Sequence, residues 1–223
     1  TKLNLRSKYG PLGGPVVVFS PNNFPFAFNA VGGGDFAAAV AAGNPVIAKA
    51  NPGHPGTTRL LAEAAFEALR TSGLPPALVQ MVYHFESRDG LRLVAHPLTG
   101  ATAFTGSRAA GLHLKEAADK AGKPISLELS SVNPVFILPG ATAERGGEIA
   151  AELAASCTMG SGQFCTKPGL VVLVDDGSGR SFLEALKRNF EAQPAGYLLS
   201  ENVLAGLQKS VDALLRARAS LVT

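Results

Sequence analysis

The stretch "PVIAKANPGHPGTTRLLAEAAFEALRTSG" (45–73) decides the fold class, because a short β-rich run is followed directly by an amphipathic helical pattern. "PVIAKA" (45–50) is typical of a buried strand. "TTRLLAEAAFEALRTSG" (57–73) places apolar residues at helical spacing, with Thr57 or Thr58 as the expected N-cap and Gly73 as the stop. A strand and a helix of these lengths in succession are the repeating unit of a parallel α/β sheet.

The same alternation continues on both sides of this stretch. Further strands are predicted at 15–20, 79–83, 101–106, 125–130, 134–139 and 170–176, and further helices at 35–43, 88–96, 107–122, 143–156 and twice after 176. The tail "LLRARASLVT" (214–223) suggests that another strand begins there. We predict an α/β protein with parallel sheets and helices on their faces, and a domain boundary near residue 130.

The composition excludes several classes of function. The 223 residues are 46% hydrophobic and 17% charged, which allows a proper core, and the net charge is only +3 with a pI near 9.0. Without a Lys/Arg run of five or more, nucleic-acid binding is not expected. No apolar run reaches the roughly 18–20 residues of a membrane-spanning helix, and no signal peptide pattern is present. A reducing, cytoplasmic setting is the default expectation, and thiols stay free there.

Two glycine motifs could hold a phosphate. "VGGGDFAA" (31–38) fits G-x-G-x-x-A formally, but the preceding strand ends about a dozen residues earlier, so plain helix entry is favoured. In "AFTGSRAAG" (103–111) a strand runs through Thr105-Gly106-Ser107 directly into a helix, whose free N–H groups favour a phosphate. By spacing alone, phosphate binding and an ordinary βα loop remain equally open for this second motif.

Cys165 lies in the glycine-rich turn "GSGQFCTKPG" (160–169), and three interpretations of it compete: a buried filler, half of a disulfide, or a nucleophile. The other cysteine, Cys157, falls within a helical pattern and is expected to be packed. Two cysteines at this spacing do not make a disulfide framework. The residues alone do not decide between filler and nucleophile.

Five motifs in register decide the matter by resemblance. "SPNNFPFAF", "GNPVIAKANPGHPGT", "AFTGSRAAG", "ISLELSSVNP" and "GSGQFCTKPG" together resemble the NAD(P)-dependent aldehyde dehydrogenase superfamily. The variants "NPGHPGT", "ELSSVNPVF" and "GQFCTKPGL" are most similar to the branch of the alpha-ketoglutarate semialdehyde dehydrogenases and the NADP-dependent fatty aldehyde dehydrogenases. The resemblance covers essentially the whole chain, although the family's N-terminal region and its later E-x-F-G-P segment are expected and not found.

The resemblance implies a Rossmann-like cofactor domain, a second α/β catalytic domain and a small oligomerisation hairpin. Residues 1–14 would be part of the hairpin, 15–129 the later part of the NAD(P)-binding domain, and 130–223 the first part of the catalytic domain. It also implies a homodimer or homotetramer, and no metal ion.

Three catalytic residues follow from the resemblance. Cys165 would be the nucleophile that adds to the aldehyde, because hydride can leave only from a tetrahedral carbon. Asn23 would donate to the oxyanion beside the N–H of Cys165. Glu128, in the otherwise apolar run "SLELSS", would be a partly desolvated general base that activates water for thioester hydrolysis.

The cofactor is expected to be NADP or NAD. Lys49 would bind the adenosine ribose, and NAD-preferring relatives carry a Glu three residues later, where this chain has Pro52, so a 2′-phosphate can fit. Arg88 is a possible phosphate partner or a surface arginine, and His54 a possible loop contact. The residues assigned to the cofactor are Lys49, Asn51, Arg88, Gly106 and Ser107.

The function implied is oxidation of an aldehyde to a carboxylic acid through a thiohemiacetal and a thioester. The expected substrate is a semialdehyde such as 2,5-dioxopentanoate, and the alternative is a fatty or other aliphatic aldehyde. A non-catalytic relative or fragment stays open. A thiol hydrolase pairing Cys165 with one of the four histidines is disfavoured, because His54, His84, His96 and His113 show no relation to it in sequence.

Overall fold

The computed structural model describes residues 7–222, and these residues form two compact units, 1–130 and 131–223. The division falls within a residue of the change predicted near 130. Of the segment 1–14 expected to be a hairpin, residues 1–6 lie outside the described residues and residues 7–14 form no strand. Each unit is described below by itself.

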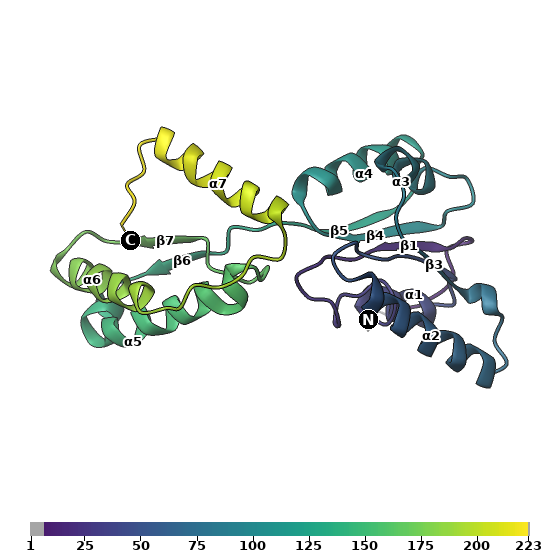
Figure 1. Ribbon diagram of the computed structural model, residues 1–223, viewed down its shortest axis with the longest axis horizontal. Helices are drawn as coiled ribbons and strands as arrows, with labels where there is room; N and C mark the ends of the chain where they lie inside the picture. The colour runs from purple at the N-terminus through teal and green to yellow at the C-terminus, as the bar shows by residue number, and fades with distance from the viewer. Residues whose placement is uncertain (1–6, 223) are drawn as a thin grey trace, which may run out of the picture. The chain divides into compact units, whose positions relative to one another are not determined.

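The first unit is a five-stranded parallel sheet in the order β3-β2-β1-β4-β5. Its strands are β1 (Val16–Phe19), β2 (Val46–Lys49), β3 (Val79–Val82), β4 (Ala101–Thr105) and β5 (Ile125–Glu128). The helices are α1 (Gly34–Ala41), α2 (Pro55–Thr71), α3 (Ser87–Val94) and α4 (Arg108–Lys120), with a short 3₁₀ turn η1 (Pro76–Leu78). Figure 1 shows α1 and α2 on one face of the sheet and α3 and α4 on the other.

The centre of the sheet is buried on both faces, as expected for a parallel sheet covered by helices. Every residue of β1 is buried, because this strand occupies the centre of the sheet and receives side chains from both helical layers. One core cluster lies around Val16, Val18 and Val46, and the other around Val17 and Phe104. The apolar run "VVVF" is therefore a central strand, and the predicted α/β class is confirmed.

The second unit is built on a two-stranded parallel sheet of β6 (Pro134–Ile137) and β7 (Leu170–Leu173). Helix α5 (Pro139–Thr158) and the 3₁₀ turn η2 (Met159–Gly162) connect the two strands, and α6 (Gly177–Glu191) packs against α5. In Figure 1 both helices lie on the same side of these strands. The core consists of Ile137, Ala150, Leu153 and Phe182, whereas the helix α7 (Glu201–Arg216) contains no buried residue.

Two local predictions differ from the structure. Helix α2 begins at Pro55 rather than at Thr57 or Thr58, because a proline at the first helical position fits the helix without losing a hydrogen bond. Thr58 is instead fully buried within the first turn. The strand expected at the C-terminal tail is not formed in residues 217–222.

Candidate functional site

The ends of the five strands of the first unit are in register. Phe19 pairs with Lys49 on one side and with Phe104 on the other, Lys49 pairs with Val82, and Thr105 pairs with Glu128. The loops that follow the strands therefore all lie at the same end of the sheet, where the strands finish. In open parallel sheets this carboxyl edge is where ligands bind, at the point where the strand order reverses, which here lies between β1 and β4.

Lys49 is the last residue of β2 and is half-buried. Burial lowers the pKa of its ammonium group, because the charged form loses part of its hydration. A cation that is partly stripped of water gains from an oxygen-rich partner. This environment suits the role implied for Lys49, which remains a prediction.

Asn51 and His54 tie the loop after β2 to the loop after β1. The Asn51 amide Nδ2 donates to the carbonyl of Ser20 at 2.9 Å, and its Oδ1 accepts from the N–H of Gly53 at 2.9 Å. The ring Nε2 of His54 lies 2.9 Å from the carbonyl oxygen of Pro21. His54 is thus a loop contact. The side-chain amide of Asn51 holds the two loops together, and the predicted contact of Asn51 with a cofactor remains a prediction.

Buried polar atoms without a partner lie beside this pair of loops. Within residues 7–222, these include Ser20 Oγ, His54 Nδ1 and Thr58 Oγ1. Buried polar groups are nearly always hydrogen-bonded, so this part of the strand edge can accept further polar partners. The residues present at the ends of β1 and β2 therefore fit a polar ligand such as a dinucleotide.

Gly106 and Ser107 form the turn between β4 and α4. The N–H of Gly106 donates to the carbonyl of Glu128 at 3.0 Å, and a Cβ at this position would lie 2.8 Å from the ring of Phe104. The Ser107 hydroxyl caps α4 by accepting from the N–H of Ala110 at 3.3 Å. These contacts explain both residues as parts of a tight βα turn, and the phosphate contact remains a prediction.

Arg88 is the second residue of α3, and its side chain is 82% exposed. Its nearest acidic partner is Asp89, with Nε and Oδ1 4.0 Å apart. An exposed pair at this distance is weak, so the guanidinium is available to an anion in solution. This position agrees equally with a surface arginine and with a phosphate partner.

Asn23 is half-buried in the segment between β1 and α1, and Glu128 is the last residue of β5. The expectation that Glu128 is a desolvated carboxylate inside an apolar strand is wrong for this unit. Strand β5 is an edge strand in which Ile125 and Leu127 are half-buried while Ser126 and Glu128 are exposed. The alternation explains how a carboxylate is tolerated in this strand without a buried partner.

Cys165 belongs to the second unit, in the loop between η2 and β7, and its thiol is free and exposed. Cys157 is also free, but it lies half-buried in α5, where its Sγ is 3.5 Å from the carbonyl of Pro168. Burial raises the pKa of the Cys157 thiol, with a smaller opposing effect of the Lys167 charge. The structure therefore contradicts the disulfide interpretation and the buried-filler interpretation of Cys165, and it agrees with the packed role expected for Cys157.

Two residues that sequence reasoning missed hold the loop of Cys165. The Asn133 amide Nδ2 donates to the carbonyls of Cys165 at 2.7 Å and of Lys167 at 2.9 Å, and the Ser131 hydroxyl lies 3.1 Å from the same Cys165 carbonyl. The only sequence signal was an asparagine directly before Pro134, which reads as an ordinary turn residue.

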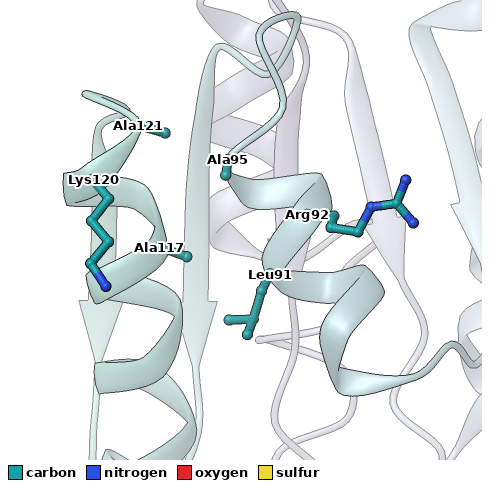
Figure 2. Close-up of a pocket in the computed structure, with 6 residues that line it drawn as sticks. All are labelled: Leu91, Arg92, Ala95, Ala117, Lys120 and Ala121. Carbon is teal, nitrogen blue, oxygen red and sulfur yellow. The ribbon is translucent and has the colours of Figure 1, made fainter.

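A shallow hollow of about 420 Å³ lies away from the strand ends, between α3 and α4. Figure 2 shows Leu91 projecting into the space between the helices and Arg92 projecting away from it. The two basic groups beside it are already paired, Arg92 with Asp89 and Lys120 with Glu116. This hollow contains none of the candidate residues.

The model of the aldehyde dehydrogenase family matches residues 3–217, which is nearly the whole chain. The chain belongs to the aldehyde dehydrogenase family. The resemblance inferred from the five motifs is thus confirmed. The family match also covers both described units, so Asn23, Glu128 and Cys165 all lie within it.

Curated relatives of this family member include alpha-ketoglutaric semialdehyde dehydrogenases. That of Acinetobacter baylyi is 42% identical over 204 residues, covering 91% of this chain and 38% of the relative. Alpha-ketoglutaric semialdehyde dehydrogenase 2 of Azospirillum brasilense is 42% identical over 192 residues, covering 85% of this chain and 36% of the relative. The chain thus spans little more than a third of the length of these relatives.

Solved structures of the family share the fold. The crystal structure of an NAD-dependent aldehyde dehydrogenase from Sinorhizobium meliloti superposes with a TM-score of 0.75 at 24% identity, covering 96% of this chain and 42% of that one. The crystal structure of an NADP-dependent enzyme of E. coli superposes with a TM-score of 0.77 at 26% identity, covering 96% of this chain and 44% of that one. The likeness extends over both units and confirms the aldehyde dehydrogenase-like α/β fold. Within residues 7–222, no helix is both long and apolar enough to cross a membrane.

Proposed function

We propose that the whole protein oxidises an aldehyde to a carboxylic acid with NADP or NAD as the hydride acceptor. The observation that carries this proposal is the free, exposed Cys165 on a loop of the second unit, in a chain whose residues 3–217 match the family model. An exposed thiol can reach an aldehyde carbon, which a packed thiol such as Cys157 cannot.

In the proposed reaction, the Cys165 thiolate adds to the carbonyl carbon and forms a tetrahedral thiohemiacetal with a negatively charged oxygen. The family resemblance assigns the side-chain amide of Asn23 and the backbone N–H of Cys165 as hydrogen-bond donors to that oxygen. Removing one such donor typically costs about 3–4 kcal/mol of transition-state stabilisation. The bound nicotinamide supplies the hydride acceptor, and loss of hydride leaves a thioester on Cys165.

Glu128 then removes a proton from water as the water attacks the thioester carbon. The carbon–sulfur bond breaks, the carboxylic acid is released, and Cys165 returns as a thiolate. An exposed carboxylate at the end of an edge strand is available to water, which suits a general base. The net change is one aldehyde and one water converted to one acid, with two electrons passed as hydride and one proton released to solvent from Glu128.

The cofactor part of the proposal rests on the first unit alone. Lys49 ends β2 as a partly dehydrated cation, and buried polar atoms of Ser20 and His54 lie beside it without partners. We assign Lys49 to the adenosine ribose and, with NADP, to its 2′-phosphate. Pro52 carries no charge that would repel a 2′-phosphate. The NADP dependence of the E. coli enzyme supports this choice.

The proposed substrate is a short semialdehyde such as 2,5-dioxopentanoate. The support is the 42% identity to two alpha-ketoglutaric semialdehyde dehydrogenases. A fatty or other aliphatic aldehyde is the alternative. Measuring kcat/KM over a panel of semialdehydes and aliphatic aldehydes separates the two, since preference for long uncharged chains would refute the semialdehyde assignment.

The chain offers a matched pair of variants for the central claim. Cys165→Ala is expected to abolish aldehyde oxidation by the full-length protein while NADP still binds. Cys157→Ala, which removes the packed thiol eight positions earlier, keeps turnover. Reduction of the cofactor is followed by its absorbance. More than a tenth of wild-type turnover in Cys165→Ala would overturn the proposal, and absence of turnover in the wild type with the whole panel would favour a non-catalytic relative.

Assembly into a homodimer or homotetramer and a cytoplasmic location belong to the same proposal. Both rest on the family resemblance. Light scattering on the purified full-length protein measures the first, and fractionation of the cells that make it measures the second.

A further inference from the structure

The nucleophile loop, defined here as residues 158–169, contributes no residue to the core cluster of the second unit. None of its residues is fully buried, and Cys165 itself is exposed. Gly160, Ser161 and Gly162 follow one another with φ of 58°, 57° and 70°, a left-handed run that non-glycine residues rarely adopt. Polar contacts therefore contribute to the conformation of this loop.

Asn133 provides two of these contacts from outside the loop. Its amide is half-buried, and Nδ2 donates to two carbonyls of the loop, those of Cys165 at 2.7 Å and Lys167 at 2.9 Å. The Ser131 hydroxyl lies 3.1 Å from both Asn133 Oδ1 and the Cys165 carbonyl. Both hydrogens of one amide group are thus committed to the backbone around the thiol.

The backbone of Asn133 is unusual for its place in the sequence. A residue before proline is normally extended, yet Asn133 precedes Pro134 and has a φ of 48°. Asparagine tolerates this left-handed region better than most residues. The conformation turns the Asn133 side chain toward the loop, and the N–H of Gly169 donates to the carbonyl of Val132 at 2.8 Å beside it.

We infer that Asn133 is a positioning residue for the Cys165 nucleophile, an inference that rests on the function proposed above. By holding the Cys165 carbonyl, Asn133 fixes the peptide between Cys165 and Thr166, and with it the direction of the Cα–Cβ bond that carries the thiol. Asn133 acts only through Cys165. Its loss should slow the chemical step and leave aldehyde binding nearly intact.

Two variants separate this role from a merely structural one. Asn133→Gly removes the amide but keeps the left-handed φ, which glycine adopts without strain. Asn133→Asp keeps the shape but replaces the donating nitrogen with an acceptor that faces two carbonyl oxygens. The matched control is Arg218→Gly, because Arg218 is exposed and also left-handed, with a φ of 68°, at the end of α7. If Asn133 were only a turn residue, Asn133→Gly would behave like Arg218→Gly.

The experiment measures kcat and KM of the full-length variants together with amide hydrogen exchange over residues 158–169. Misplacing a reacting group by about 1 Å can cost about a hundredfold, so we expect kcat to fall about 10- to 100-fold in both Asn133 variants. The aldehyde KM should stay within about threefold, because the lost interaction acts in the transition state. Exchange in the loop should become faster in both, and Arg218→Gly should match the wild type in every measurement.

Wild-type kcat in both Asn133 variants, with Cys165→Ala inactive, would overturn the inference. So would unfolding of both variants under conditions in which Arg218→Gly stays folded, since Asn133 would then serve folding alone. Failure of the proposed function has a different signature, namely oxidation retained by Cys165→Ala. The hydrogen-exchange measurement needs neither aldehyde nor turnover. Unchanged exchange over residues 158–169 in both variants would therefore overturn the inference that Asn133 holds this loop, whatever the activity.

Discussion

A single substitution at Phe182 should lower the free energy of unfolding of the second unit without affecting the first. Phe182 is the largest side chain of a small core, is 1% exposed, and belongs to the same cluster as Ile137, Ala150 and Leu153. Replacing a buried phenylalanine with alanine typically costs about 3–5 kcal/mol, because the lost contacts are joined by the cavity that remains. At about 1.4 kcal/mol for each factor of ten, Phe182→Ala should raise the unfolded fraction of this unit by about 100- to 4,000-fold.

Leu183 supplies the matched control for this substitution. It is the next residue of α6, but its side chain points outward and is 47% exposed. Surface substitutions usually change stability by about 0.5 kcal/mol or less, so Leu183→Ala should leave the unit nearly unchanged. Hydrogen exchange resolved along the sequence, measured in increasing urea, reports residues 131–223 separately from residues 7–130.

The functional consequence follows from the division of the candidate residues between the units. Phe182→Ala should abolish oxidation in moderate urea, because the Cys165 loop belongs to the unit that unfolds, while cofactor binding by the first unit persists. Equal destabilisation by Phe182→Ala and Leu183→Ala would refute the reasoning. So would simultaneous loss of protection in both units, since their cores contain different residues.

Three further predictions concern the chemistry. Glu128→Gln should give a rapid burst of reduced cofactor followed by slow turnover in stopped-flow measurements; disappearance of the burst would mean that Glu128 acts before hydride transfer. Pro52→Glu should raise the KM for NADP at least about tenfold and raise the KM for NAD less, because like charges at a binding site cost on the order of several kcal/mol. An unchanged ratio of kcat/KM for the two cofactors would exclude Pro52 as the determinant of cofactor preference. Iodoacetamide should label Cys165 well before Cys157 at neutral pH, because burial raises the pKa of the Cys157 thiol and keeps that thiol protonated. Labelling of Cys157 should rise only at higher pH. Equal labelling rates of the two cysteines, measured by mass spectrometry, would contradict this prediction.

Where the local pattern and the tertiary environment agreed, the sequence was sufficient to predict the structure. The run "VVVF" predicted a buried strand, and β1 is buried along its whole length because helices cover both faces of the sheet. For Glu128 the same reasoning failed, because the local pattern does not say whether both faces of a strand are covered. In β5, Ile125 and Leu127 pack against the core cluster around Val17 and Phe104, whereas the alternate residues Ser126 and Glu128 are exposed.

The contacts of Asn133 were beyond prediction for a related reason. Its partners Cys165 and Lys167 lie 32 and 34 positions later in the chain, across the whole of α5. Sequence rules for an asparagine before proline describe local turns, and they predict an extended backbone. The positive φ and the long-range hydrogen bonds become visible only once β6 and β7 are paired.

The central position of β1 also sets the order in which the first unit can assemble on the ribosome. One neighbour, β2, begins 30 residues after β1, but the other, β4, pairs Ala101 with Val16, 85 residues away. At a synthesis rate of about 5–20 residues per second, β4 is synthesised on the order of several seconds after β1. During that interval one hydrogen-bonding edge of the most hydrophobic strand of the sheet is open. We therefore expect nascent chains that end between β2 and β4 to need chaperones, and this requirement to cease once residue 105 has left the ribosomal tunnel.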